Sequence, residues 1–511
     1  MRVLIWGTGK LTKKYMQYEY FTNCEIIGFV DSYKKDAFFM EYPVYEPSEI
    51  TLLDYEYLIV CVVKYNSEIL QTCIKEGIDL RKVFLASGKT NYEGELSKYS
   101  GQLLNKDEVV SVFPILCKEL EERQEREKYI HSFDIDKELT ESATIYQLDD
   151  QHIVVWIPIE LLFSQRTEDN IIDKCTDEWK LHNSRWADLP MIMFEPHKSL
   201  YAFFLYGLEY PNNYCKWFQK IYTTRGLFSG YTNEMLIEKR LREFRIMQGE
   251  LNKGMFFFIE HPAKAKWNPK GYFNLLDGHH RTMFLYSSGL TRIPVQITRN
   301  DYDMWCNKEM AVSVHEIIKK QKRKEFYQPI LNPYYLDLNS YREGYAKSRY
   351  HYIMEYFGSQ RLTDKKVIDI GANLGYMGQA FARMGCDVTL LEPDPLNCEL
   401  MRKINDLLYI KCTTVMEKFE DYKTTEKFDI AILLTVFCHY FSDETIKVKF
   451  VQHLNKIVSQ MIIWESVDSP DEEKKYIIEQ TKFTNYQRLC YTYATGKFRE
   501  LGIFWFNESN L

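Results

Sequence analysis

Several acidic, glycine and asparagine residues near the end of the chain have a spacing that could bind a small molecule. The segment VIDIGANLGYMG at 367–378 joins an apolar strand to a helix through a glycine-rich turn, and the next strand ends at Glu392. Glycine allows a tight bend and close approach of a ligand, and asparagine is the ordinary residue that best tolerates positive φ. An acid about 20 positions on can accept both ribose hydroxyls. The pattern predicts a nucleoside-containing cofactor at the carboxyl edge of a parallel sheet, bound by Asp369, Gly371, Asn373, Gly375 and Glu392.

The pattern D-x-G-A-N-x-G-Y, followed by LEPDP, resembles the first two motifs of class I S-adenosylmethionine (SAM) methyltransferases, nearest their FkbM-like, surface-polysaccharide branch. The resemblance extends over about 330–511 and implies SAM as the cofactor of a seven-stranded sheet. In that fold, 428–441 is the fourth strand with its active-site loop, 459–466 is the fifth strand, and an antiparallel hairpin closes the sheet. The alternative is a dinucleotide-binding unit. It is disfavoured because the acid before the first glycine would lie beside a pyrophosphate.

Two residues could act on the methyl acceptor. Methyl transfer from a sulfonium requires an acceptor placed in line and often a base that takes its proton. His439 follows the expected fourth strand and has a side chain suited to base catalysis near neutrality; Glu465 ends the expected fifth strand. His439 could instead pack under the adenine or the substrate. The tyrosine-rich segment 334–357 is expected to form a lid over the cofactor.

A second group of polar residues, Asp277, Gly278, His279, His280 and Arg281, stands between an expected strand and the start of a helix. Backbone N–H groups at a helix start, with arginine and histidine beside them, form an anion site, and phosphate is the natural ligand. The alternative is that the histidines only hydrogen-bond the turn. Adjacent histidines do not face each other on a helix, so we predict no metal site there.

The DGHHR motif, the following GxxxIPV pattern and an earlier IPxxxL resemble the ParB/sulfiredoxin-like fold over roughly 150–305. Members of that superfamily bind nucleotides or phosphoryl groups at this turn, and they include ADP-dependent serine kinases that carry DGHHR. The resemblance implies ADP, ATP or another nucleotide as a ligand. The kinases also use an upstream acid, for which Glu160 and Glu168 are candidates. The segments 201–218 and 253–268 have no counterpart in the small kinases.

The amino-terminal residues alternate between strand and helix patterns, which predicts a small parallel sheet. Gly7, Gly9 and Asp31 form an incomplete dinucleotide fingerprint, because its third glycine would fall at Thr12. The segment resembles the Rossmann-like domain of bacterial sugar-modifying proteins such as PglD-type sugar acyltransferases. That resemblance implies a nucleotide or nucleotide-sugar ligand, and a purely architectural or docking role is the alternative.

The whole chain sets further bounds. A length of 511 residues exceeds one hydrophobic core. The net charge of −7, without a basic half, gives no reason to expect a nucleic-acid partner. The sequence begins on a strand and predicts no signal peptide, and no apolar run approaches the ~20 residues of a membrane span. The 12 cysteines form no CxxC pair, which indicates a reducing, cytoplasmic location.

We therefore predict an α/β protein of three domains. These are a Rossmann-like domain at 1–95, a helical linker at 96–140, an α+β ParB/sulfiredoxin-like domain at 141–330 and a class I methyltransferase domain at 331–511. The expected function is SAM-dependent methylation of a sugar or glycan intermediate in bacterial surface-polysaccharide biosynthesis. Two alternatives remain: a bifunctional kinase-methyltransferase, and a scaffold that binds nucleotide or SAM without turnover. Self-association and association with polysaccharide-assembly enzymes stay open.

Overall fold

The computed structural model describes most of the chain outside 86–142. The described segments are 2–9, 25–33, 37–62, 83–85, 143–164, 188–206, 209–224, 231–323, 326–336, 348–441, 443–466, 470–494 and 497–506, with a few single positions between them. The predicted linker at 96–140 lies outside the described residues except for Leu139, and so does Glu168. Below, the middle part means the described residues of 143–323 and the C-terminal part means those of 348–506.

The amino-terminal segment forms a six-stranded sheet of order β3-β4-β2-β1-β5-β6. Its strands run parallel except for the antiparallel pair β3 and β4, which agrees with the predicted small parallel sheet. The alternating apolar residues of the central strands are buried on both faces. The bounds are β1 (Arg2–Trp6), β2 (Glu25–Val30), β3 (Phe38–Phe39), β4 (Tyr42–Tyr45), η1 (Pro47–Leu52), β5 (Tyr57–Val60) and β6 (Val83–Leu85).

The middle part is built on a mixed six-stranded sheet of order β7-β8-β12-β10-β11-β9. Its long antiparallel pair places Val155 of β8 opposite Val295 of β12, and both are fully buried. The strands are β7 (Ile145–Gln147), β8 (His152–Pro158), β9 (Leu162–Ser164), β10 (Ala263–Asn268), β11 (Tyr272–Asp277) and β12 (Arg292–Thr298). The helices are η3 (Ile159–Leu161), η4 (Met191–Met193), α7 (Glu195–Tyr206), α8 (Asn212–Thr224), α9 (Asn233–Asn252), α10 (Phe256–Glu260), α11 (His279–Ser287), α12 (Arg299–Cys306) and α13 (Lys308–Lys320).

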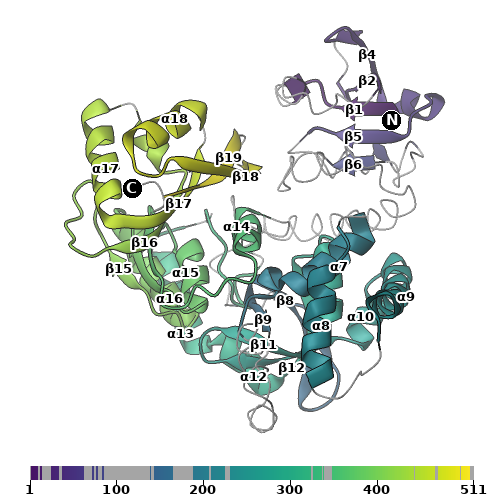
Figure 1. Ribbon diagram of the computed structural model, residues 1–511, viewed down its shortest axis with the longest axis horizontal. Helices are drawn as coiled ribbons and strands as arrows, with labels where there is room; N and C mark the ends of the chain where they lie inside the picture. The colour runs from purple at the N-terminus through teal and green to yellow at the C-terminus, as the bar shows by residue number, and fades with distance from the viewer. Residues whose placement is uncertain are drawn as a thin grey trace.

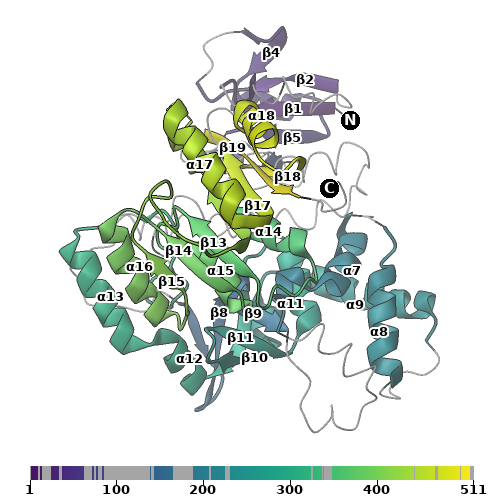
Figure 2. The ribbon, with the colours of Figure 1, turned by 60° about the vertical axis from the view of Figure 1, so that its left-hand side comes forward.

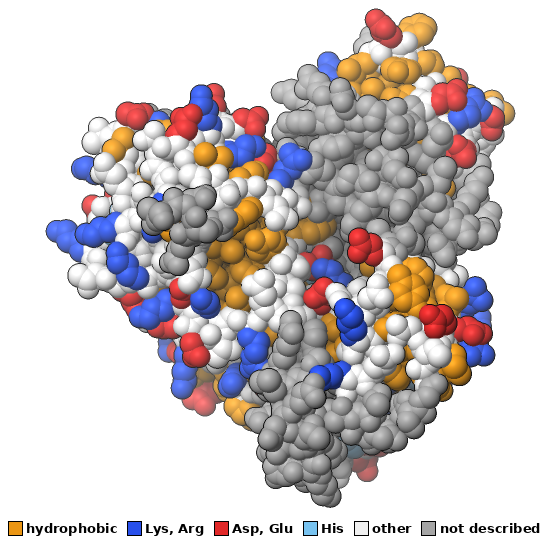
Figure 3. Space-filling view, viewed as in Figure 1, with side chains coloured by type: hydrophobic (Ala, Val, Ile, Leu, Met, Phe, Trp, Pro, Cys, Tyr) orange, Lys and Arg blue, Asp and Glu red, His pale blue; other side chains and the backbone are white. Residues whose placement is uncertain are grey.

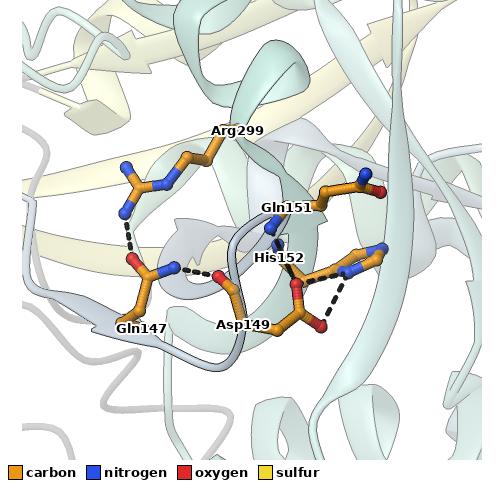
Figure 4. Close-up of polar contacts among 5 residues, drawn as sticks. All are labelled: Gln147, Asp149, Gln151, His152 and Arg299. Atoms are coloured by element: carbon orange, nitrogen blue, oxygen red, sulfur yellow. Dashed lines mark hydrogen bonds and ion pairs between the residues drawn. The ribbon is translucent and has the colours of Figure 1, made fainter.

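The hairpin between β7 and β8 is held by side chains rather than by glycine (Figure 4). One carboxylate oxygen of Asp149 accepts from the backbone N–H groups of Gln151 and His152, both at 2.8 Å, and the His152 ring lies 3.0 Å from the same carboxylate. These backbone hydrogen bonds lower the pKa of Asp149. Gln147 in turn pairs with Arg299, which connects the hairpin to α12.

The C-terminal part contains a seven-stranded sheet of order β15-β14-β13-β16-β17-β19-β18. Five strands are parallel, and β19 runs antiparallel to both β17 and β18. The expected fourth strand, fifth strand and closing hairpin are observed as β16, β17 and β18–β19. The elements are α14 (Arg349–Phe357), β13 (Lys366–Ile370), α15 (Tyr376–Arg383), β14 (Asp387–Leu391), α16 (Pro395–Leu407), β15 (Thr413–Val415), β16 (Phe428–Leu434), η5 (Phe437–His439), α17 (Glu444–Ile457), β17 (Val458–Ser466), α18 (Pro470–Gln480), β18 (Asn485–Ala494) and β19 (Lys497–Trp505).

The middle and C-terminal parts share one hydrophobic core. A single cluster of buried residues extends from Ile153 in β8 to Ile503 in β19, and α13 lies alongside α16 (Figures 1 and 2). At their contact, a side chain on Gly271 would collide with the carbonyl oxygen of Leu408, and Arg383 donates to the Gly271 carbonyl at 3.1 Å. The α/β class is confirmed. The boundary predicted at 330 falls among buried residues of this shared core, so it does not mark a flexible junction.

The surface is mixed in charge. On the face shown in Figure 3, the described basic and acidic side chains are interspersed rather than gathered into one basic patch. Each helix within the described residues is either too short or too polar to cross a membrane.

Candidate cofactor site

The glycine-rich turn after β13 has the backbone that the sequence predicts. Gly371, Asn373 and Gly375 all have positive φ, of 70°, 55° and 83°. A side chain on Gly371 would lie 2.7 Å from Val436 Cγ2, and one on Gly378 would collide with Leu390, so both glycines are required by close packing. Asn373 thus holds a glycine-like conformation, as expected from its type.

The two predicted acids lie on either side of this turn. Asp369 is buried, accepts from the Gly378 N–H at 3.0 Å, and has its pKa raised to about 7 by burial. Glu392 is also buried, and its carboxylate accepts from the Asn373 N–H at 2.8 Å and the Asp394 N–H at 3.1 Å. The structure therefore brings the five predicted cofactor residues together at the carboxyl edge of β13 and β14.

A residue that sequence reasoning missed, Gln328, hydrogen-bonds the start of α15. Gln328 is 5 % exposed, and its side-chain oxygen accepts from the N–H groups of Leu374 at 3.2 Å and Tyr376 at 3.1 Å. Together with Asp369, Glu392 and two backbone carbonyls, it engages the N–H groups of residues 371–376 and of Gly378. A bound anion would find these donors already engaged.

The same turn presents an acceptor instead. The side-chain oxygen of Asn373 is buried and has no hydrogen-bond partner within the described residues. A buried acceptor of this kind costs stability unless a ligand donates to it. With the Glu392 carboxylate nearby, this edge of the sheet suits a ligand that carries donors such as an ammonium group and ribose hydroxyls. SAM has both, so the residues present fit it.

The two candidate catalytic residues have opposite surroundings. His439 lies in η5, beyond the carboxyl end of β16, and is exposed. Glu465 at the end of β17 is 1 % exposed, contacts Arg349 Nη1 at 3.0 Å and accepts from the Thr435 hydroxyl. A histidine at the surface of this edge can meet an acceptor, whereas the Glu465 carboxylate is engaged by a buried guanidinium.

The helix expected to act as part of a lid is a packed element. Residues 339–347 lie outside the described residues, but α14 is described and is almost entirely buried. It packs between η4 of the middle part and β18 of the C-terminal part. Helix α14 is therefore a packed part of the shared core, and its role as a cover over the cofactor stays a prediction.

The DGHHR motif is placed as predicted, at the start of α11. Gly278 has φ of 88° and precedes the helix without a side-chain cap. The Arg281 guanidinium donates to the His261 carbonyl at 2.7 Å and to Asp277 at 3.0 Å. His279 is half-buried, and burial lowers its pKa to about 4, so it is neutral at pH 7.

The second histidine of the motif is held by inserted helices. The ring nitrogens of His280 lie 3.0 Å from the Tyr201 hydroxyl of α7 and 3.2 Å from the Tyr214 hydroxyl of α8. The ring of buried His197 lies beside it, with centroids 4.2 Å apart, and burial lowers the pKa values of both histidines. His280 thus makes structural hydrogen bonds. In the described part of the chain, no cluster of three His, Cys, Asp or Glu side chains could hold a metal ion.

Glu160, one candidate for the kinase acid, contacts the helix that follows the glycine-rich turn of the cofactor site. Its carboxyl group accepts from the Tyr376 hydroxyl of α15 at 3.2 Å. This contact crosses from the middle part to the glycine-rich turn of the C-terminal part.

The residues of the amino-terminal fingerprint, Gly7, Gly9 and Asp31, have different surroundings. Gly7 has φ of 115° and is packed against Val62, whereas a side chain on Gly9 would meet open space. Asp31 accepts from the Thr8 hydroxyl and from the Tyr33 N–H. Thr12, where the third glycine would fall, is buried and donates to the Gly7 carbonyl at 2.7 Å.

Neither of two open cavities coincides with these predicted sites. One of about 820 Å³ lies between α7 and the end of α14, lined in part by Lys198, Glu355 and Arg361. The other, of about 500 Å³, lies near the start of β15 and includes Arg402 and Lys411.

Comparisons with known proteins give a family match for one end of the chain. The family model described as C2185-like, N-terminal, matches residues 1–84, and no curated protein matches the sequence significantly. Similar solved structures include the bifunctional kinase-methyltransferase WbdD, at 18% identity and a TM-score of 0.32, covering 38% of this chain and 46% of WbdD. This chain therefore matches less than half of the WbdD chain.

Two further structures are similar over most of their own length. Magnesium protoporphyrin IX methyltransferase (ChlM) from Synechocystis PCC 6803, solved with bound SAM, is 12% identical with a TM-score of 0.26 and covers 41% of this chain and 83% of its own. The N-methyltransferase NodS from Bradyrhizobium japonicum WM9 is 13% identical with a TM-score of 0.25 and covers 29% of this chain and 90% of its own. At these scores, the activities of those proteins are not transferred to this chain.

Proposed function

We propose that the C-terminal part binds SAM and that the protein methylates a sugar or glycan intermediate of bacterial surface-polysaccharide biosynthesis. The observation that carries the cofactor is the turn at 371–378, whose N–H donors are engaged by protein oxygens while the Asn373 side-chain oxygen has no described partner. The polysaccharide context comes from the sequence resemblance of the two ends of the chain, not from residue chemistry.

The main rival cofactor is a dinucleotide. A dinucleotide places its pyrophosphate on the free N–H groups of the glycine-rich turn and the following helix start. In this protein Gln328 accepts from that helix start, and Asp369 and Glu392 put carboxyl groups beside it. A pyrophosphate would have to displace one oxygen and approach two acids. These contacts favour a cationic cofactor over an anionic one.

The residues of the turn have distinct roles in this proposal. Glu392 accepts the ribose hydroxyls through carboxylate lone pairs that its backbone contacts leave available. The Asn373 side-chain oxygen accepts from the ammonium group. When bound, SAM supplies an electrophilic methyl group. Sugar hydroxyls are weak acids, so their methylation needs a base. In this proposal that base is His439, which is exposed and follows the carboxyl end of β16.

Calorimetry on the intact chain tests the cofactor. S-adenosylhomocysteine (SAH) and SAM should bind, and NAD should not; NAD binding without SAH binding would reject the proposal. Mass spectrometry of co-purifying ligands provides an independent check. Release of SAH in the presence of nucleotide-sugars or polysaccharide precursors tests turnover. Binding of SAM without turnover on any such acceptor would favour the scaffold alternative.

The bifunctional alternative is favoured by one observation. The start of α15 is engaged by the Gln328 side chain, whereas no side chain within the described residues accepts from the first N–H groups of α11, and a helix start of this kind attracts anions. Arg281 would have to exchange Asp277 for the phosphate. ADP, ATP and CTP should therefore be titrated into the wild-type chain and Arg281→Ala. The full chain is needed because the middle part shares its core with the C-terminal part. Equal binding to both proteins would reduce the motif to a structural turn.

A further inference from the structure

Two side chains reach the glycine-rich turn from outside the segment that resembles a methyltransferase. Glu160 follows β8 in the middle part and accepts from the Tyr376 hydroxyl at 3.2 Å. Gln328 precedes α14 in the chain and accepts from the N–H groups of Leu374 and Tyr376. Both therefore act on the first residue of α15, which follows Gly375 directly.

These contacts lie in a fully buried layer. Glu160 is 5 % exposed, Gln328 is 5 % exposed and Tyr376 is 2 % exposed. His351 of α14 also lies near Glu160, with 3.7 Å between Nε2 and the oxygen that accepts from Tyr376. The Ser348 N–H donates to Nδ1 of His351 at 3.0 Å, so Nε2 is the ring nitrogen on the side of Glu160. The Glu160 carboxyl group is thus buried beside α14 and α15 and accepts from the Tyr376 hydroxyl.

We propose that Glu160 and Gln328 are positioning residues of the cofactor site, which hold the start of α15 and with it the turn at 371–375. This inference rests on the proposed SAM binding. It assigns the middle part a role in the methyltransferase site whatever the DGHHR turn binds.

The physical reason is that a turn with positive φ at three alternate positions needs support from its surroundings. Gly371, Asn373 and Gly375 adopt positive φ, and glycine in particular has many other conformations open to it. A binding site is held in its productive geometry by neighbours whose own positions are locked by packing and hydrogen bonds. Buried Glu160 and Gln328 meet that requirement, and the Tyr376 hydroxyl transmits the position of Glu160 to the turn.

A matched pair of hydroxyl deletions tests the inference. Tyr376→Phe removes the hydroxyl that contacts Glu160. Tyr286→Phe removes another tyrosine hydroxyl at the same interface, which donates to Glu355 at 2.6 Å but does not contact the turn. In calorimetry on the intact chain, Tyr376→Phe should weaken SAH binding about tenfold, the effect of roughly one hydrogen bond. Tyr286→Phe should bind SAH within about twofold of wild type.

The other side of the contact is tested by Glu160→Ala, Glu160→Gln and Gln328→Ala. Glu160→Gln keeps an acceptor oxygen for Tyr376 and should bind SAH with wild-type affinity. Glu160→Ala and Gln328→Ala should bind SAH more weakly. Glu160→Ala combined with Tyr376→Phe should cost no more than either change alone, since both remove one contact. If Glu160→Ala does not fold, Tyr376→Phe still decides the question.

The outcomes separate the inference from the proposed function. Wild-type chain that binds neither SAM nor SAH would overturn both. Wild-type binding with unchanged affinity in Tyr376→Phe and Gln328→Ala would overturn the positioning role alone. Equal loss in Tyr376→Phe and Tyr286→Phe would also overturn it, because the effect would then be general to the interface.

Discussion

The buried pair of Arg349 and Glu465 allows the two candidate bases to be separated by experiment. Glu465 is 1 % exposed and Arg349 is 2 % exposed, and their charged groups lie 3.0 Å apart. Glu465→Ala removes the carboxylate from a guanidinium that is out of water. Breaking a buried pair by removing one partner costs about 3–5 kcal/mol. His439 is exposed, so His439→Ala should change the free energy of unfolding by no more than about 0.5 kcal/mol.

The His439→Ala variant should therefore lose turnover but keep its stability, whereas Glu465→Ala should lose stability. His439→Ala should keep wild-type stability and SAH affinity and lose turnover by about 10²–10⁴-fold, as expected for a lost base. Glu465→Ala should lower the urea midpoint markedly. Arg349→Met combined with Glu465→Leu should recover much of that loss, since replacing both charges by apolar side chains is often neutral or stabilising.

Urea unfolding can be followed by tryptophan fluorescence, because Trp464 precedes Glu465 in β17 and is fully buried. Turnover is measured as SAH release, with affinity measured separately. A Glu465→Ala protein of wild-type stability that binds SAH but has lost turnover would refute the reasoning and make Glu465 the base. Full activity in both single variants would instead favour an acceptor that is already an anion, such as a phosphate.

Three further predictions concern charge. Burial raises the pKa of Asp369 to about 7; a cationic cofactor favours its carboxylate, so SAM affinity should fall up to about tenfold per pH unit below pH 7, and calorimetry should find no such dependence in Asp369→Asn. Glu392→Ala should weaken SAH binding by about 1.5–3 kcal/mol, whereas Asp394→Ala, which removes only the cap of α16, should not; equal affinities would remove Glu392 from the ribose site. The pKa of His279 is lowered to about 4 by burial, so its contribution to stability is complete above about pH 6.5 and is lost as pH falls toward 4, by at most about 1.4 kcal/mol per pH unit. Between pH 7 and pH 4.5 the melting temperature should therefore fall more in wild type than in His279→Phe, and an equal fall in both proteins would contradict this.

The features that the sequence predicted well are local in the chain. The strand, turn and helix around Asp369 follow from apolar runs and glycine spacing, and Asn373 takes positive φ because of its own side chain. Glu392 directly follows β14, a strand that pairs in parallel with β13, as alternating strands and helices imply. Each of these inferences used residues no more than one strand–helix unit apart.

The features that it missed depend on residues far apart. Gln328 meets Tyr376 across 48 positions and Glu160 meets it across 216, and nothing in the local spacing of either residue marks it as part of the site. The packing around the boundary predicted at 330 shows a related limit. Apolar periodicity identifies which face of an element is buried but not which neighbour covers it, so it could not predict that the two sheets share one core.

The contacts made by the inserted segment 201–218 could not be predicted from local sequence either. Residues 201–218 were noted only as a departure from the small kinases, yet they supply Tyr201 and Tyr214, which hydrogen-bond His280. A histidine predicted to donate to a phosphate is thereby engaged by protein hydroxyls, leaving Arg281 and the helix start as the parts of the motif that could meet a ligand.

The two helix starts in this protein carry opposite expectations for ligand charge. Both follow a glycine with positive φ, Gly278 before α11 and Gly375 before α15. At α15 the Tyr376 N–H is engaged by Gln328 and the Gly378 N–H by Asp369. At α11 no side chain within the described residues accepts from the first N–H groups, and Arg281 lies in the first turn. The same local geometry thus favours a cation-bearing ligand at one site and an anion at the other. Side chains that lie far away in the sequence make that difference.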